Sequence, residues 1–200
     1  MSDVQTGFRR VMVVGNSGAG KSSLGATLAE ALEIPFVDLD DEFWGAGWQE
    51  PPDEAWRARV EGLIEPPAWL LAGNFGSTVE IRAPAADLVV QMSLPPALCV
   101  WRLVLRSLKI RFGRQIWRLP RDCRAGPDWE PMRDYPAFLL YTARWRRSSE
   151  PRQRERLAAA GVERLIRLRS SADVRRLLRD LEESDAPSEV LASWLTPLPA

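Results

Sequence analysis

The sequence predicts a three-layer α/β fold in which helices flank a five-stranded parallel sheet. Five short apolar runs have the length of strands, and they lie at 10–14, 34–38, 68–73, 87–93 and 164–168. Most of them lack a strict alternation of apolar and polar residues, which is typical of strands buried on both faces of a parallel sheet. Helix-like segments lie between them, and strands that alternate with helices indicate consecutive βαβ units.

Helices are expected in the connections and after the last strand. The first follows a glycine-rich loop, where Leu24, Leu28 and Leu32 recur every fourth residue. The others are expected at 52–65, at 77–80, from 95 onward, at 137–160 and at 170–183. Pro151 predicts a break in the segment 137–160, because proline lacks the N–H that a helix requires. Residues 184–200 shift to Pro, Ser and Ala and are expected to pack loosely.

The composition is that of one globular domain, and it excludes several kinds of site. The 200 residues are 46% hydrophobic and 27% charged. There is no apolar run long enough to span a bilayer and no apolar core of signal-peptide type, so a cytoplasmic protein is expected. Histidine is absent, which excludes a His-based catalytic triad and a His-ligated metal. The two cysteines are too few for a disulfide framework or a zinc site.

One motif carries a clear chemical function. The octapeptide GNSGAGKS matches the phosphate-binding pattern G-x-x-x-x-G-K-[ST] without a mismatch, and it lies between a predicted strand and a predicted helix. Its backbone N–H groups and the start of the following helix suit the phosphates of ATP, while the lysine suits the outer phosphates and the serine hydroxyl suits Mg²⁺. The predicted nucleotide-binding residues are Gly15, Asn16, Ser17, Gly18, Ala19, Gly20, Lys21, Ser22 and Ser23.

The use of lysine supports this interpretation. Of the 27 basic residues only Lys21 and Lys109 are lysines, and the remainder are arginines. A chain that uses arginine almost everywhere has a lysine at the one position where a slim ammonium is needed and a guanidinium would not fit.

The position of two carboxylates distinguishes among classes of P-loop protein. The guanine motif N-K-x-D is absent, and the later strands do not end in a carboxylate as those of motor-type ATPases do. Instead Asp38 and Asp40 close the strand that follows the first helix, a spacing typical of small-metabolite and nucleotide kinases. Asp40 is the candidate for a Mg²⁺-bound water or an acceptor hydroxyl. Asp38 either contributes to the acceptor site or caps a turn.

Charge is distributed unevenly along the chain, although the net charge is zero. Residues 36–66 hold nine acidic and two basic residues, whereas 100–156 hold fifteen basic and six acidic ones. In the basic block Arg102 and Arg106 are spaced for one helix face, in series with Arg114 and Arg118. A second cluster includes Arg144, Arg146 and Arg147. Phosphoryl transfer needs positive charge around the migrating group, so Arg106 and Arg144 join Lys21 and Asp40 as predicted catalytic residues.

Several longer segments resemble one family. Together with the loop, PFVDLDDEFWGAGW, WLLAGNFGSTVEIR, LCVWRLVLRSLKIR and YTARWRRSSEPR resemble the adenylate-kinase-like DNA topology modulation proteins (FlaR-type) over about residues 10–181. The resemblance implies a nucleoside/nucleotide-kinase type of P-loop NTPase fold with a five-stranded parallel core. It also implies an acceptor pocket lined by Asp40, Trp44, Asn74 and Arg82, with Arg102 and Arg106 leading into a lid. Trp44 and Trp48 either stack a base or are pinned on the domain surface.

The sequence departs from the family at two pocket positions. The family often has a histidine where Asp38 stands, which makes this pocket more acidic, and Phe75 replaces a tyrosine. The chain is thus expected to be a single P-loop kinase-like domain over 1–183, with an acceptor-binding segment at about 38–66, a lid-like segment at about 112–131 and a tail at 184–200.

These features predict an ATP- and Mg²⁺-dependent phosphotransferase acting on a small molecule. The wealth of arginine favours a nucleoside monophosphate as acceptor, whereas FVDLD fits a hydroxyl-bearing metabolite, because a carboxylate takes up the hydroxyl proton. LLAGNFG lacks the glycine triplet expected of shikimate kinase. The alternative is a nucleotide-binding regulatory protein whose arginines contact nucleic acid. Nucleic acid is not expected as a partner, because no recognised nucleic-acid motif is present.

Overall fold

The predicted strands lie side by side in one sheet. The computed structural model describes residues 7–112, 120–124 and 135–196. Its strands are β1 (Arg10–Gly15), β2 (Phe36–Asp38), β3 (Trp69–Ala72), β4 (Leu88–Met92), β5 (Leu165–Leu168) and β6 (Leu195–Thr196). Their order across the sheet is β2-β3-β1-β4-β5-β6. The first five are parallel, as predicted, and β6 adds a short antiparallel edge on β5.

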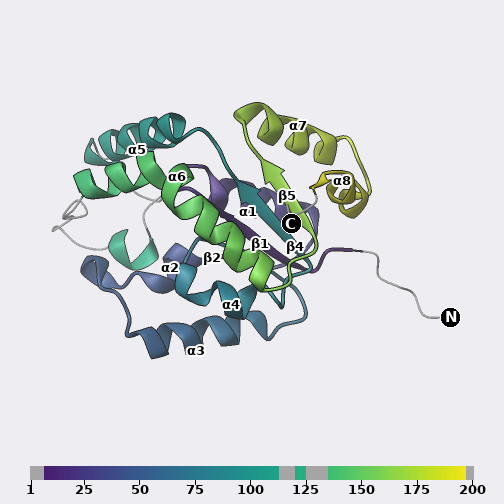
Figure 1. Ribbon diagram of the computed structural model, residues 1–200, viewed down its shortest axis with the longest axis horizontal. Helices are drawn as coiled ribbons and strands as arrows, with labels where there is room; N and C mark the ends of the chain where they lie inside the picture. Colours follow the sequence, from purple (N-terminus) through teal and green to yellow (C-terminus); the bar gives the residue numbers. More distant parts are fainter. Residues whose placement is uncertain (1–6, 113–119, 125–134, 197–200) are drawn as a thin grey trace.

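Helices cover both faces of this sheet, so the three-layer prediction is confirmed (Figure 1). Alternate residues of each strand face opposite layers: Val11 and Val13 pack with Leu28 of α1 (Lys21–Ala31). Met12 and Val14 belong to the other core. That core includes residues of α2 (Leu39–Phe43), α3 (Asp53–Ile64), α4 (Val79–Arg82) and α6 (Tyr135–Ala159). Because both faces of the inner strands β1, β3 and β4 are buried, these strands read as nearly continuous apolar runs.

The helix boundaries follow local signals in the sequence. Pro96 occupies the first turn of α5 (Pro96–Arg111), where the missing N–H costs no helical hydrogen bond. At α7 (Ser171–Glu182) the Ser170 hydroxyl accepts from the Asp173 N–H, and the Asp173 carboxylate accepts from the Ser170 N–H in return. The short turns η1 (Ala46–Trp48), η2 (Gly76–Thr78) and η4 (Arg121–Arg124) complete the connections.

Two expectations about local structure are wrong. The helix α6 runs without interruption through Pro151, because residues on both sides of the proline, including Trp145, Glu150 and Leu157, are buried and fix its course. The tail does not pack loosely: residues Pro187–Ser193 form α8, and Leu191 is fully buried in the core beside α7. Tertiary packing overrides the local composition in both cases.

The described part of the chain contains no helix that is both long enough and apolar enough to cross a membrane. The longest helix, α6, has 25 residues and carries many arginines.

Candidate active site

The glycine-rich loop joins β1 to α1 at the carboxyl edge of the sheet, as predicted. Its glycines are required by geometry as well as by chemistry. Gly15 and Gly18 have φ of +142° and +76°, and a Cβ there would lie 2.3 Å from the Met92 carbonyl oxygen and 2.5 Å from the Cys99 carbonyl oxygen. The loop is thus pressed against β4 and α5 with no room for side chains at these positions. Gly20 ends the loop in a left-handed conformation, and Lys21, Ser22 and Ser23 open α1.

Lys21 folds back across the loop. Its Nζ donates a hydrogen bond to the Asn16 carbonyl oxygen at 3.2 Å. Burial lowers the pKa of Lys21, while the carboxylates of Asp40 and Asp38 oppose this shift. The ammonium therefore lies within the field of both aspartates, which are brought to the loop by β2.

Asp38 and Asp40 have different surroundings. Asp38 is the last residue of β2, and its Oδ1 accepts from the Asp40 N–H at 3.1 Å, so that it caps α2. The capping interpretation of Asp38 is thus confirmed. Asp40 is exposed rather than enclosed in a core. The nearby protein mass raises its pKa by desolvation, and the charges of Lys21 and Arg106 oppose that rise.

The two arginines of α5 serve different neighbours. Arg106 acts on both Lys21 and Asp40 through its charge, so the three groups are close enough to interact electrostatically. One turn earlier, Arg102 donates from Nη1 to the Ala19 carbonyl oxygen at 2.9 Å and from Nη2 to the Ser171 hydroxyl at 3.3 Å. The guanidinium of Arg102, which the resemblance assigns to the acceptor side and the approach to a lid, thus ties the loop to the start of α7.

Arg82 is also placed elsewhere than the resemblance implies. It is fully buried, and its guanidinium donates to the carbonyl oxygens of Asn74 and Phe75 at 2.7 and 3.0 Å and to the Thr78 hydroxyl at 3.3 Å. A third carbonyl, that of Gly73, lies at 3.4 Å. Burial lowers the pKa of Arg82 to about 10. A guanidinium so enclosed has no free donor surface for an acceptor, and its task is to shape the turn after β3.

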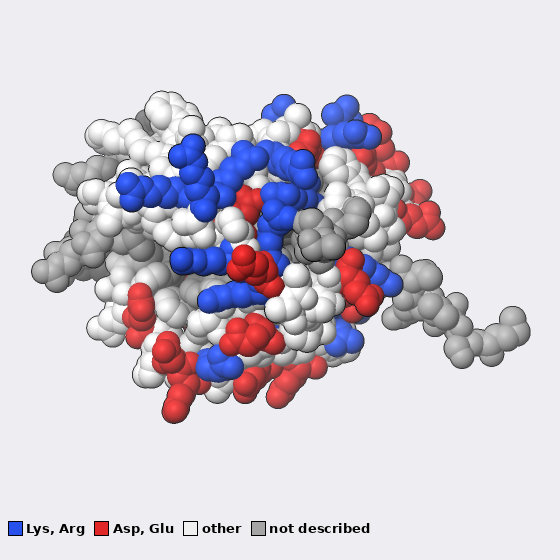
Figure 2. Space-filling model, in the orientation of Figure 1, with Lys and Arg blue, Asp and Glu red and all other residues white. Residues whose placement is uncertain are grey.

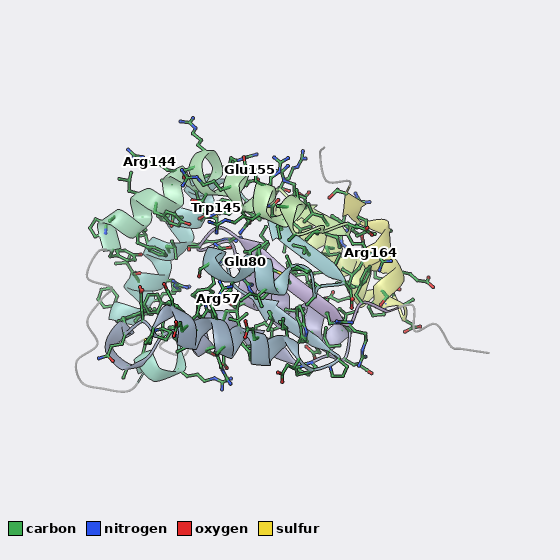
Figure 3. All side chains as sticks on the ribbon, turned by 60° about the horizontal axis from the view of Figure 1, so that its bottom comes forward. Arg57, Glu80, Arg144, Trp145, Glu155 and Arg164 are labelled. Atoms are coloured by element: carbon green, nitrogen blue, oxygen red, sulfur yellow. The ribbon has the colours of Figure 1, made fainter. Side chains whose placement is uncertain are left out.

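Replacement of Arg82 by methionine is accordingly expected to destabilise the fold, because it leaves buried carbonyls without donors. We expect a loss of about 2–4 kcal/mol in the free energy of unfolding, measured by denaturant titration. Arg82→Lys should restore little, since one ammonium cannot serve several carbonyls in a plane. The matched control is Arg57→Gln, which breaks the exposed pair between Arg57 and Glu80 (Figure 3). Equal stability of the Arg82→Met and Arg57→Gln variants would contradict the assignment.

Asn74 lies at the base of the loop. Its Oδ1 accepts from the Gly15 N–H at 2.8 Å and from Gln153 Nε2 at 3.2 Å. The side-chain oxygen expected to face an acceptor is thus used by the loop and by α6. A second contact joins the loop to α6: Asn16 Nδ2 donates to the Thr142 carbonyl oxygen at 2.9 Å. The sequence analysis did not identify Gln153 or Thr142, because single polar residues within an arginine-rich helix give no recognisable pattern.

Trp44 belongs to an aromatic cluster between α2 and α3. Its ring packs edge-on against Phe43 at a centroid distance of 4.9 Å and against Trp48 at 5.5 Å. Phe43 in turn contacts Phe75 at 4.7 Å. Trp44 is half-buried, so this packing pins the ring and leaves part of its surface accessible.

Arg144 lies on the exposed face of α6, and its catalytic role stays a prediction. The buried face of α6 includes Thr142 and Trp145, and Arg144 lies about 200° around the helix from Thr142. Its side chain is exposed and points away from the sheet, whereas Trp145 is buried (Figure 3). Of the lid-like segment 112–131, only 112 and 120–124 lie within the described residues. Arg114 and Arg118 lie outside them.

The described piece of that segment contacts the acceptor side. The Arg121 N–H donates to Asp41 Oδ1 at 2.9 Å, and Arg121 Nε lies 3.3 Å from Asp41 Oδ2. Figure 2 shows the uneven charge in space: lysine and arginine gather on the upper part of this face, and acidic residues along its lower edge.

Comparisons with known proteins agree with this arrangement. Among solved structures, the chain is similar to shikimate kinase from Acinetobacter baumannii, determined in complex with shikimate, with 18% identity and a TM-score of 0.52 over 88% of this chain and 92% of that one. The chain has a P-loop kinase fold. Residues 17–48 also match the family model of shikimate kinase, from the glycine loop through α1, β2 and α2 to η1.

More distant structural similarities are found with other small-molecule kinases. A gluconokinase from Sinorhizobium meliloti has 17% identity and a TM-score of 0.48, with 92% of each chain covered. Shikimate kinase from Bacteroides thetaiotaomicron has 18% identity and a TM-score of 0.47, over 88% of this chain and 99% of that one. Among curated proteins no match is found.

Proposed function

We propose that this protein is an ATP-dependent phosphotransferase that moves the γ-phosphoryl group to a small molecule. The observation that carries the proposal is the glycine loop itself, whose Lys21 lies within the electrostatic field of Asp40 and Arg106. The loop supplies a phosphate cradle, the two cations suit the migrating phosphoryl group, and the carboxylate suits the incoming nucleophile. The sequence resemblance to the DNA topology modulation proteins supports the same class of activity.

The donor set around the loop fits Mg²⁺. The described residues hold no cluster of three or more acidic or cysteine side chains, which is what a dedicated protein cage would need. Mg²⁺ in kinases is instead held by one or two protein oxygens, by nucleotide phosphates and by water. The Ser22 hydroxyl at the exposed start of α1 and the Asp40 carboxylate would hold it here. When bound, the ion would neutralise charge on the phosphate oxygens.

We further propose that the acceptor carries a hydroxyl group as its nucleophile. Asp40 would take the hydroxyl proton while the acceptor oxygen bonds to the γ-phosphorus and the bond to the ADP oxygen breaks. The case for a nucleoside monophosphate depended on the number of arginines. Arg82 is buried among carbonyls and Arg144 lies on the outer face of α6, which weakens that case. Phe43, Trp44 and Phe75 offer the acceptor an apolar wall.

Purified protein with Mg·ATP tests the proposal directly. ADP release would be measured with three acceptor classes: hydroxy acids and sugars, nucleosides, and nucleoside monophosphates, with Lys21→Ala as the blank. We expect Lys21-dependent ADP release with a hydroxyl-bearing acceptor. Stimulation by nucleoside monophosphates alone would overturn the acceptor assignment and keep the kinase. Nucleotide binding without turnover for any class would overturn the kinase.

Arg106→Ala should lower kcat about 10²-fold, because it removes positive charge next to the migrating phosphoryl group. Thermal unfolding should change little, since the side chain is only partly buried. Lys109→Ala on the same helix is the matched control, because Lys109 is exposed. An Arg106→Ala enzyme with the kcat of the Lys109→Ala enzyme would remove Arg106 from the site.

A second candidate function has one observation in its favour. Arg146, Arg147 and Arg152 are exposed on α6. A nucleotide-dependent regulatory protein would use this surface to bind nucleic-acid phosphates. Such binding weakens steeply with salt, because each phosphate contact releases counterions. The affinity for a short DNA duplex, measured at low and at moderate salt, distinguishes the two functions. Nucleic-acid binding should weaken steeply with salt, whereas kinase turnover should depend far less on it.

A further inference from the structure

A chain of side-chain amides leads from the glycine loop to α6. Gly15 is the last residue of β1, while the neighbouring strand β3 already ends at Ala72. The Asn74 side chain supplies the acceptor that the strand no longer offers, and its Oδ1 lies 2.8 Å from the Gly15 nitrogen. Gly15 is therefore held by β4 on one side, where it pairs with Met92, and by the Asn74 side chain on the β3 side.

The orientation of each amide in this chain is fixed by its neighbour. Because Asn74 presents its oxygen to the Gly15 N–H, Gln153 must present Nε2 to the same oxygen, at 3.2 Å. The Gln153 oxygen then accepts from Gln91 Nε2, also at 3.2 Å, and Gln91 is fully buried on β4. If one of these side-chain amides rotated by half a turn, it would place a donor against a donor or an acceptor against an acceptor.

α6 holds the next loop residue as well, and it is itself firmly anchored. Asn16 is fully buried, and its Nδ2 donates to the Thr142 carbonyl oxygen at 2.9 Å. Glu150, which is 3% exposed, accepts from the Ser93 hydroxyl at 2.7 Å and pairs with Arg167 of β5. The first two residues of the phosphate cradle are therefore both positioned by α6, and α6 is in turn hydrogen-bonded to β4 and ion-paired with β5.

We propose that Gln153 is a positioning residue for nucleotide binding, acting on the glycine loop through Asn74. The inference deepens the proposed function, since it assumes that the loop binds ATP. Gln153 itself does not touch the nucleotide. Its amide holds the Asn74 oxygen in the orientation that fixes the Gly15 N–H, and the following loop amides take their direction from that residue.

The test is a double-mutant cycle read out as the Kd for Mg·ATP by calorimetry. Gln153→Met, which keeps the shape and removes both hydrogen bonds, should raise the Kd about 5- to 10-fold. Gln153→Glu keeps the acceptor for Gln91 but has no donor for Asn74, so it should weaken binding to a similar extent. In an Asn74→Leu background, Gln153→Met should cause no further loss, because the link is already broken.

A matched control separates positioning from general loss of stability. Leu157 is fully buried on the same helix and faces the same layer, so Leu157→Val should lower the Tm by an amount comparable to that of Gln153→Met while leaving the Kd unchanged. An unchanged Kd in Gln153→Met, additive effects in the double variant, or an equal rise in Kd for Leu157→Val would each overturn the proposal. Because the readout is binding, absent acceptor turnover would contradict only the proposed function. A wild-type protein that binds no nucleotide would overturn both.

Discussion

Lys21→Ala is expected to lower kcat about 10²- to 10³-fold. The ammonium of Lys21 lies at the end of the loop and donates a hydrogen bond to the Asn16 carbonyl oxygen at 3.2 Å. It is free to turn toward a phosphate, where it would neutralise charge that grows on the migrating group. Burial lowers the pKa of Lys21, so the charged form is costly in the folded protein without phosphate. We therefore expect turnover to fall without loss of thermal stability.

Two controls sharpen this experiment. Lys109→Ala removes the other lysine of the chain from an exposed position and should leave kcat unchanged. Lys21→Arg keeps the charge but introduces a planar, broader group, so most of the loss should persist. Initial rates of ADP formation are compared at saturating Mg·ATP. Rates for Lys21→Ala within threefold of the wild type would show that the loop does not act on a migrating phosphoryl group.

Asp40→Asn is expected to lower kcat about 10²- to 10⁴-fold, because the amide cannot accept the acceptor proton. The affinity for ATP should change much less. The variant should also have a higher Tm than the wild type at neutral pH. Desolvation by the surrounding protein raises the pKa of Asp40, so the folded protein binds this proton more tightly than the unfolded chain does. The free energy of unfolding therefore falls as the pH rises from the pKa of Asp40 in the unfolded chain to its pKa in the folded protein. At any pH above both values the ionised carboxylate destabilises the fold.

The pH dependence of kcat/KM gives an independent check on Asp40. A base must be ionised to act, so activity should fall on the acid side with a midpoint above the usual pKa of an aspartate, about 3.9. The Asn variant should lose that acid limb. A wild-type profile that is flat down to the usual aspartate range, or an Asn variant with unaltered kcat, would assign Asp40 a structural role.

The loop and the strands were predictable because their signals are local. The eight consecutive residues GNSGAGKS are enough to predict the conformation of the loop and the charge at its end. Each buried strand is predicted by one apolar run. The placing of Asp40 near the loop was also predictable, since parallel strands end at one edge of the sheet. The course of α6 past Pro151 and the packing of Leu191 were not, because both depend on residues remote in the sequence.

The arginines show the same division most clearly. The sequence by itself determined that positive charge is abundant in 100–156, that one lysine ends the glycine loop and that the fold is a three-layer α/β sheet. Only the tertiary structure decided which cation does what. Arg106 acts on Asp40 through its charge, Arg102 ties the loop to α7, Arg82 is enclosed by carbonyls and Arg144 faces solvent. The physical reason is that a guanidinium suits phosphate, carbonyl oxygen or water equally well, and the folded chain determines which of them it meets.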